Sequence, residues 1–155
     1  MSCRVFKDPT NTKLTEPHTG CCSGGGGLVS TIGDCGRFVR MLLNKGQLDG
    51  KKVLGRKTVE LMMQDHLPEG VAMKNILHVK GGMGFGLGGS VVLNPAANGH
   101  PGSKGTFSWG GAANTYYCVD PEEGIGFVMM TQIMPSFDLC VWRRQVHALV
   151  LAALV

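Results

Sequence analysis

The serines are the side chains of this sequence that could attack a carbonyl group, and none has the neighbour that would activate it. A serine nucleophile needs a base within hydrogen-bond reach, and in one recurring motif this base is a lysine three residues further on. The serines are Ser2, Ser23, Ser30, Ser90, Ser103, Ser108 and Ser136. The residues three places after them are Val5, Gly26, Gly33, Leu93, Thr106, Gly111 and Leu139, none of them a lysine. Because Gly-x-Ser-x-Gly and Tyr-x-Asn are also absent from the sequence, we expect no catalytic residue in this chain.

The sequence contains no convincing motif for a cofactor or a metal. The segment Gly84 to Gly89 matches G-x-G-x-x-G, but a dinucleotide site requires a helix after it, and Ser90 to Leu93 favour a strand. No two of the 5 histidines are four residues apart, and the 6 cysteines form no C-x-x-C pair. We therefore expect no cofactor and no metal, with the histidines on the surface and the thiols buried and free.

Composition and charge exclude several other classes of protein. With 155 residues, 43% of them hydrophobic and 17% charged, the chain suits one globular domain. The net charge of +4 comes from scattered basic residues, so we expect no nucleic-acid or membrane partner. No apolar stretch approaches the roughly 20 residues that span a bilayer, and no signal peptide follows Met1. The compartment stays unknown, with the cytoplasm as the default.

The first half of the chain predicts a loop and two short helices. Residues 1–23 contain turn-forming pairs and no periodicity, which favours an extended loop. Apolar residues at helical spacing predict a helix over 31–45, which Gly46 ends. A hairpin around Asp49-Gly50 and a second helix over 56–66 follow.

The second half predicts strands and a terminal helix. Alternation predicts one strand from Phe85 to Leu93, then strands over 106–110, 114–119 and 124–131, the last two joined by a turn over 120–124. The terminal helix gathers its apolar residues on one face, namely Leu139, Trp142, Val146, Leu149, Val150 and Ala153. Short connections favour antiparallel pairing, so we expect an α+β fold with this helix packed on an antiparallel sheet. One helix cannot cover both faces of the sheet, and the chain offers only the two short upstream helices for the other face.

Four segments, by their order and spacing, resemble a known family. They are Gly24 to Thr31 followed by Phe38 and Met41-Leu42-Leu43, then Gly84 to Gly88, Gly105 to Thr115, and Asp120 to Gln132. Over about residues 20 to 150 the chain resembles class C β-lactamase-like proteins and related penicillin-binding-protein-like esterases. The resemblance implies a partial β-lactamase/transpeptidase-like fold, with residues 24–155 as the C-terminal part of such a domain.

That family carries out serine acyl transfer, and its Ser-x-x-Lys and tyrosine lie upstream of the segments matched here. The resemblance therefore implies a C-terminal fragment of a serine hydrolase that is inactive alone. The complete protein would act on a small ester or amide, and a complementary N-terminal segment is a possible partner. The alternatives are a non-catalytic remnant that binds a ligand or partner, and an incomplete gene model.

The resemblance also assigns a substrate-binding wall to Trp109, Gly110, Gly111 and Ala112. Trp109-Gly110-Gly111 stands where lactamases have Lys-Thr-Gly, and the missing lysine favours an ester or amide hydrolase over a dedicated β-lactamase. By position, the backbone N–H of Ala112 would be one donor of an oxyanion hole, the pair of N–H groups that stabilises the charged carbonyl oxygen of the transition state. The alternative is that these glycines only permit a tight turn and close packing.

Overall fold

The computed structural model describes residues 30–71, 73, 81–111, 113–133 and 139–154. The chain divides into two units, residues 1–31 and residues 32–155, and every described helix and strand belongs to the second. The extended loop expected for residues 1–23 lies outside the described residues. The boundary expected at residue 24 also falls there and stays a prediction.

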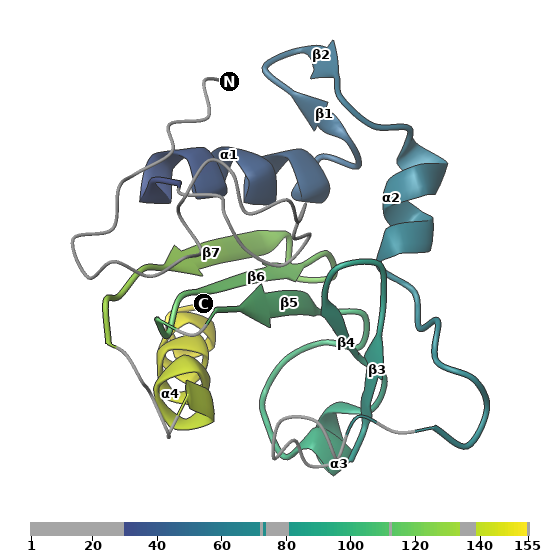
Figure 1. The fold of residues 1–155 in the computed structure, drawn as a ribbon, viewed down its shortest axis with the longest axis vertical. Helices are drawn as coiled ribbons and strands as arrows, with labels where there is room; N and C mark the ends of the chain where they lie inside the picture. Colours follow the sequence, from purple (N-terminus) through teal and green to yellow (C-terminus); the bar gives the residue numbers. More distant parts are fainter. Residues whose placement is uncertain (1–29, 72, 74–80, 112, 134–138, 155) are drawn as a thin grey trace, which may run out of the picture. The chain divides into compact units, whose positions relative to one another are not determined.

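The second unit contains helices on both faces of an antiparallel sheet (Figure 1). The helices are α1 (Ile32–Leu43), α2 (Arg56–Met62), α3 (Pro95–Asn98) and α4 (Leu139–Ala152). The strands are β1 (Gln47–Leu48), β2 (Lys51–Lys52), β3 (Met83–Phe85), β4 (Ser90–Val92), β5 (Phe107–Gly110), β6 (Tyr116–Asp120) and β7 (Ile125–Met129). Strands β3 to β7 form a 5-stranded sheet in chain order, every neighbouring pair antiparallel. The predicted α+β class and antiparallel sheet are confirmed.

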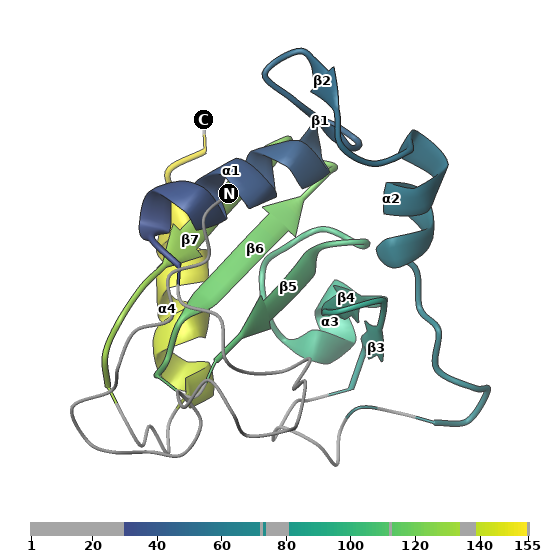
Figure 2. The same cartoon turned by 45° about the horizontal axis from the view of Figure 1, so that its top comes forward.

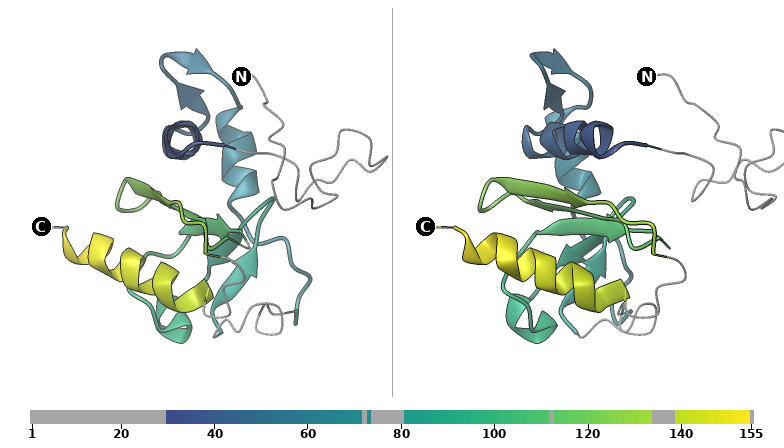
Figure 3. Two further views of the ribbon diagram at one scale, coloured as in Figure 1. Left: turned by 60° about the vertical axis from the view of Figure 1, so that its left-hand side comes forward. Right: turned by 90° about the vertical axis from the view of Figure 1, so that its left-hand side faces the viewer.

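Helix α1 covers one face of the sheet over β6 and β7, and α4 lies against the opposite face (Figure 3). The predicted packing of the C-terminal helix on the sheet is therefore confirmed, and one of the two upstream helices covers the other face. No helix in the described part of the chain has the length and apolar character needed to cross a membrane.

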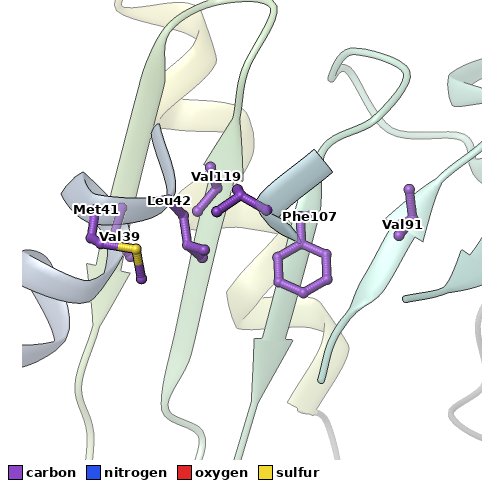
Figure 4. Packing of buried hydrophobic residues seen from close by; sticks show 7 residues of the cluster. Val39, Met41, Leu42, Val91, Phe107 and Val119 are labelled. Carbon is purple, nitrogen blue, oxygen red and sulfur yellow. The ribbon is translucent and has the colours of Figure 1, made fainter. Parts of the chain in front are cut away.

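The apolar core lies between α1 and the sheet (Figure 4). Val39 and Leu42 of α1 are buried against Phe107 of β5 and Val119 of β6. The helix ends where predicted, because Gly46 takes a left-handed φ of 97° and donates its N–H to the carbonyl of Met41. The helix thus ends over β6 and β7.

The β1–β2 hairpin confirms the predicted turn at Asp49-Gly50. Both residues have positive φ, 49° and 75°, as a two-residue turn of this hand requires. Helix α2 is shorter than predicted and ends at Met62 instead of His66. The carbonyl of Met62 accepts the N–H of Leu87, and the N–H of His66 bonds to the carbonyl of Phe85, so this segment pairs with the β3–β4 region instead of continuing the helix.

The single strand predicted from Phe85 to Leu93 is wrong, because the chain folds there into the β3–β4 hairpin. Phe85 pairs with Ser90, and the N–H of Gly86 closes the loop on the carbonyl of Gly89. A Cβ on Gly89 would lie 2.7 Å from the ring of Phe107. The glycines of the G-x-G-x-x-G match thus allow a turn and close packing on β5.

The turn predicted between β6 and β7 is confirmed, and a buried carboxylate holds it. Oδ1 of Asp120 accepts the N–H groups of Glu122 and Glu123 within the turn. Oδ2 accepts the N–H of Ser103 and the hydroxyl of Thr106. This fixes the register of the strands β5, β6 and β7, which run side by side in Figure 2.

The buried face of α4 differs from the prediction. Trp142 and Leu149, expected to be buried, are 56% and 71% exposed, whereas His147, expected at the surface, is only 6% exposed. The sheet face that meets α4 carries polar side chains, and His147 approaches the thiol of Cys118 there. Hydrophobic periodicity selected the wrong face of α4, because a polar side chain, His147, occupies the buried position. The side chain of Leu139 lies outside the described residues.

Candidate functional site

Strand β5 has an open outer edge at Trp109 and Gly110. Strand β4 pairs only with the first two residues of β5, Val91 with Phe107 and Ser90 with Ser108. In the described part of the chain, β6 is the only strand that pairs with β5 beyond Ser108, so the opposite edge of β5 has no partner strand there.

The backbone of Gly110 faces this open edge. Gly111 donates its N–H to the carbonyl of Thr115 at 3.0 Å, on the β6 side of the strand. Because successive N–H and C=O groups alternate between the two sides of a strand, those of Gly110 point away from β6. Ser108 has the same orientation, but there β4 lies opposite. The edge thus offers a donor and an acceptor to an extended ligand.

A groove of about 210 Å³ lies beside this edge, on the sheet face that α1 covers. Its floor is the cross-strand row Trp109, Tyr117 and Val128, one residue from each of β5, β6 and β7. Cys35 of α1 and Met130 close its sides. The groove is mostly apolar, so it suits the uncharged part of a small molecule.

The structure places three of the four predicted wall residues, Trp109, Gly110 and Gly111, in the lining of this groove. Ala112, the expected oxyanion-hole donor, lies outside the described residues. The glycines also have a packing role. A Cβ on Gly110 would lie 2.5 Å from the guanidinium carbon of Arg143, and a Cβ on Gly111 would lie 2.7 Å from the hydroxyl of Thr115.

The other groove residues come from elements that sequence reasoning did not connect with the site. Tyr117 and Val128 face the groove because they pair in register with Trp109 and with each other. The register follows from the hairpin turns, so these two could have been found by counting outward from them. Cys35 and Met130 carry no local signal, since only the packing of α1 on the sheet brings them there.

The groove tyrosines are unsuited to act as bases. Burial raises the pKa of Tyr117 to about 12, and the nearby Cys118 adds to the rise. Its hydroxyl donates a hydrogen bond to the carbonyl of Gly88 at 3.1 Å. Burial also raises the pKa of Tyr116. Both phenols are therefore neutral near pH 7, whereas a general base works best with a pKa near the operating pH.

Cys118 and His147 lie on the other face and form the nearest approach to a nucleophile–base pair in the described residues. Their Sγ and Nε2 atoms are 3.6 Å apart. Burial raises the pKa of Cys118 to about 12, and burial together with His100 lowers the pKa of His147 to about 4. The pair is a neutral thiol beside a neutral imidazole, and the thiolate needed for attack does not form. The described residues contain no group of three or more His, Cys, Asp or Glu that could hold a metal.

The sequence that carries this strand edge and groove matches a known protein family. A family model described as Beta-lactamase matches residues 4–151. The chain belongs to the beta-lactamase family. The family expected from the sequence is confirmed.

Two curated proteins resemble the chain in sequence. Protein Rv1367c of Mycobacterium tuberculosis (strain ATCC 25618 / H37Rv) and Uncharacterized protein MT1414 of the CDC 1551 / Oshkosh strain are each 41% identical to it over 123 residues. The match covers 76% of this chain and 31% of each relative. The chain thus spans about a third of the length of the curated relatives it matches.

Solved structures of other beta-lactamase-like proteins share the fold. EstCE1, a hydrolase with promiscuous acyltransferase activity, superposes with a TM-score of 0.69 at 24% identity, over 95% of this chain and 37% of its own. Simvastatin Synthase (LovD) from Aspergillus terreus superposes with a TM-score of 0.67 at 27% identity, over 86% of this chain and 37% of its own. The chain therefore has the fold of a beta-lactamase-like hydrolase or acyltransferase.

Proposed function

We propose that this chain supplies one wall of an acyl-transfer pocket for a small ester or amide, while the attacking serine comes from outside these 155 residues. The observation that carries the proposal is the open edge of β5 at Trp109 and Gly110, directly beside the apolar groove. The edge binds the polar backbone-like part of a substrate, and the groove binds its acyl group.

The open edge aligns the reacting carbonyl. A substrate that lies along β5 like an added strand exchanges hydrogen bonds with the N–H and C=O of Gly110. The family resemblance makes the N–H of Ala112, two residues further along the sequence, the candidate donor to the carbonyl oxygen. Loss of one such donor lowers the rate by about 100- to 1000-fold in acyl-transfer enzymes.

The groove favours neutral acyl groups. Trp109, Tyr117 and Val128 form its floor, and none of its lining residues is charged. A carboxylate-bearing substrate would have to give up its hydration there without gaining a cation, which is costly. Trp109 in place of a lysine supports the same preference for an uncharged ester or amide.

The first test is an activity assay on the purified chain with a chromogenic ester and a chromogenic cephalosporin. We expect no turnover, because the sequence contains no Ser-x-x-Lys. Turnover that survives the controls with serine-directed inhibitors, or that is lost when one of the chain's own serines is replaced, would refute the proposal.

The second test supplies a segment that would carry the attacking serine. The part of Protein Rv1367c that the chain does not match is supplied in trans. We expect ester hydrolysis to appear only with both pieces and to fall roughly tenfold or more in Trp109→Ala, since a large buried aromatic contact is lost. Trp142→Ala, on the exposed side of α4, serves as the matched control.

A non-catalytic binding module remains the second candidate function. The described groove residues support it, because their tyrosines are held neutral and no histidine or carboxylate lies among them. Ligand binding by the groove without any turnover after complementation would favour this candidate over acyl transfer.

A further inference from the structure

A second hollow lies on the α4 face of the sheet, behind the strand that borders the groove. It is a partly open cavity of about 110 Å³ between the strands and α4. Trp109 and Gly110 of β5 line both hollows, so the end of this strand separates them. Acyl transfer in the groove does not use this cavity.

The cavity has an apolar body. Met73, Val92 and Trp109 lie in its wall, and the first two are buried. The buried hydroxyls of Ser90 and Ser108 lie 3.3 Å apart in the same wall, and Ser90 donates its hydrogen bond to the carbonyl of Ser108. An apolar cavity with a few polar groups is the usual form of a small-molecule site.

The ionisable side chains that line the cavity are arginines, histidines and a tyrosine. Arg143 and Arg144 of α4 line it, and no carboxylate does. Arg144 donates from one amino group to Oδ1 and the carbonyl of Asn98, and it makes no ion pair with a carboxylate of the described residues. A half-buried guanidinium with spare donors favours an anion, above all a planar carboxylate.

Asp120 is a buried carboxylate near this region, and it does not form an ion pair with Arg144. Its two oxygens accept four hydrogen bonds, from Ser103, Thr106, Glu122 and Glu123. Its charge favours the protonated form of His147 and so acts at the histidine end of the cavity. The positive end is therefore the one at Arg144.

We propose that this cavity binds a small carboxylate with a compact apolar body, its carboxylate at Arg144 and its body against Met73 and Val92. An apolar cavity of about 150 Å³ in another protein holds benzene. A cavity of about 110 Å³ suits a slightly smaller body, and isobutyrate is a probe of that size. The site is distinct from the groove and does not depend on acyl transfer.

The test uses the fluorescence of Trp109. The chain has 2 tryptophans, so Trp142→Phe leaves Trp109 as the reporter. This variant is titrated with isobutyrate and, in parallel, with its neutral isostere isobutyramide at constant ionic strength. We expect a saturable change in Trp109 emission with isobutyrate, and binding of isobutyramide roughly tenfold weaker or worse, because hydrogen bonds to charged groups are the stronger ones.

Variants then locate the charge that is recognised. Arg144→Gln should weaken isobutyrate roughly tenfold and leave isobutyramide unchanged, whereas a merely structural role of Arg144 would weaken both alike. Arg40→Gln, on α1 at the other face, is the matched control and should change neither. Val92→Phe, which fills the cavity, should abolish the isobutyrate response, and any isobutyramide response that remains in this variant comes from the groove, which Trp109 also lines, and is subtracted. Near-UV circular dichroism verifies that each variant is folded.

Three results would overturn the proposal. They are equal binding of acid and amide, an Arg144→Gln variant whose preference for the acid matches that of the parent, and no saturable change up to about 50 mM isobutyrate, a concentration that detects even weak binding. If Val92→Phe does not fold, the Arg144→Gln comparison decides alone. None of these results bears on the ester assays, so the two proposals fail separately.

Discussion

The two faces of the sheet differ in what packs against them. On the α1 face, Phe107 and Val119 meet Val39 and Leu42, and this contact is apolar throughout. On the α4 face, Ser108 and Cys118 of the same two strands meet polar and charged residues of α4, above all His147. Adjacent residues of one strand therefore make apolar contacts on one face of the sheet and polar contacts on the other. We therefore expect the α1 face to contribute most to stability and the α4 face to make stability depend on pH through His147.

The largest expected effect is on the α1 face. Phe107→Ala removes a ring that is 1% exposed and leaves a cavity among α1, β4 and β6, so we expect the free energy of unfolding to fall by about 3 to 5 kcal/mol. Urea unfolding followed by circular dichroism measures it. Val53→Ala, at an exposed site, is the control and should change the value by less than about 0.5 kcal/mol. A loss below about 1 kcal/mol for Phe107→Ala would show that the core does not lie where we place it.

The next effect belongs to the α4 face and depends on pH. In the unfolded chain His147 binds a proton below about pH 6.5, whereas in the folded chain it stays neutral until about pH 4. Between these values the unfolded state binds more protons, so stability falls as the pH falls, in total by about 2 to 3 kcal/mol. His147→Gln should remove this part of the pH dependence. Parallel unfolding curves from pH 7.5 to pH 4 measure the difference, and equal slopes for both proteins would contradict the buried neutral imidazole.

The smallest expected effect is on the free energy of unfolding and comes from a glycine inside α1. Gly36 lies in the middle of this helix, and a Cβ added there would meet no heavy atom within 4 Å. Gly36→Ala should therefore raise the free energy of unfolding by about 0.5 to 1 kcal/mol, because alanine loses less backbone entropy in a helix. A shift of the thermal midpoint upward would show this. Destabilisation would mean that α1 packs more closely than the structure indicates.

The sequence predicted the α1 face far better than the α4 face, for a physical reason. Alternation and helical spacing report hydrophobic burial, so the strands β5 to β7 and two inner residues of α1, Met41 and Leu42, were found, although Phe38 of the same stripe is 41% exposed. On α4 the same rule selected Trp142 and Leu149, which are exposed, and missed His147, because polar contacts leave no periodic trace. The β3–β4 hairpin was missed because Gly86 to Gly89 form a turn inside an alternating pattern.

The candidate site was only partly within reach of the sequence. The family resemblance pointed to Trp109, Gly110 and Gly111, and the structure brings all three to one groove. The open edge at Gly110 could be recognised only from the strand pairing, because it depends on where β4 ends. Tyr117 and Val128 could be assigned to the groove only from the strand register. Cys35 could be assigned to it only from the packing of α1 on the sheet.

The central claim is that the open edge of β5 and the groove beside it bind the acyl part of a small ester or amide. The most direct measurement is a series of ¹⁵N–¹H spectra of the chain during titration with N-methylbutanamide, an uncharged amide with a short acyl chain. We expect the largest shifts at the amide of Gly110 and the indole N–H of Trp109, with the indole of Trp142 unchanged. Shifts that leave Gly110 unaffected, or that are largest on α4, would contradict the claim.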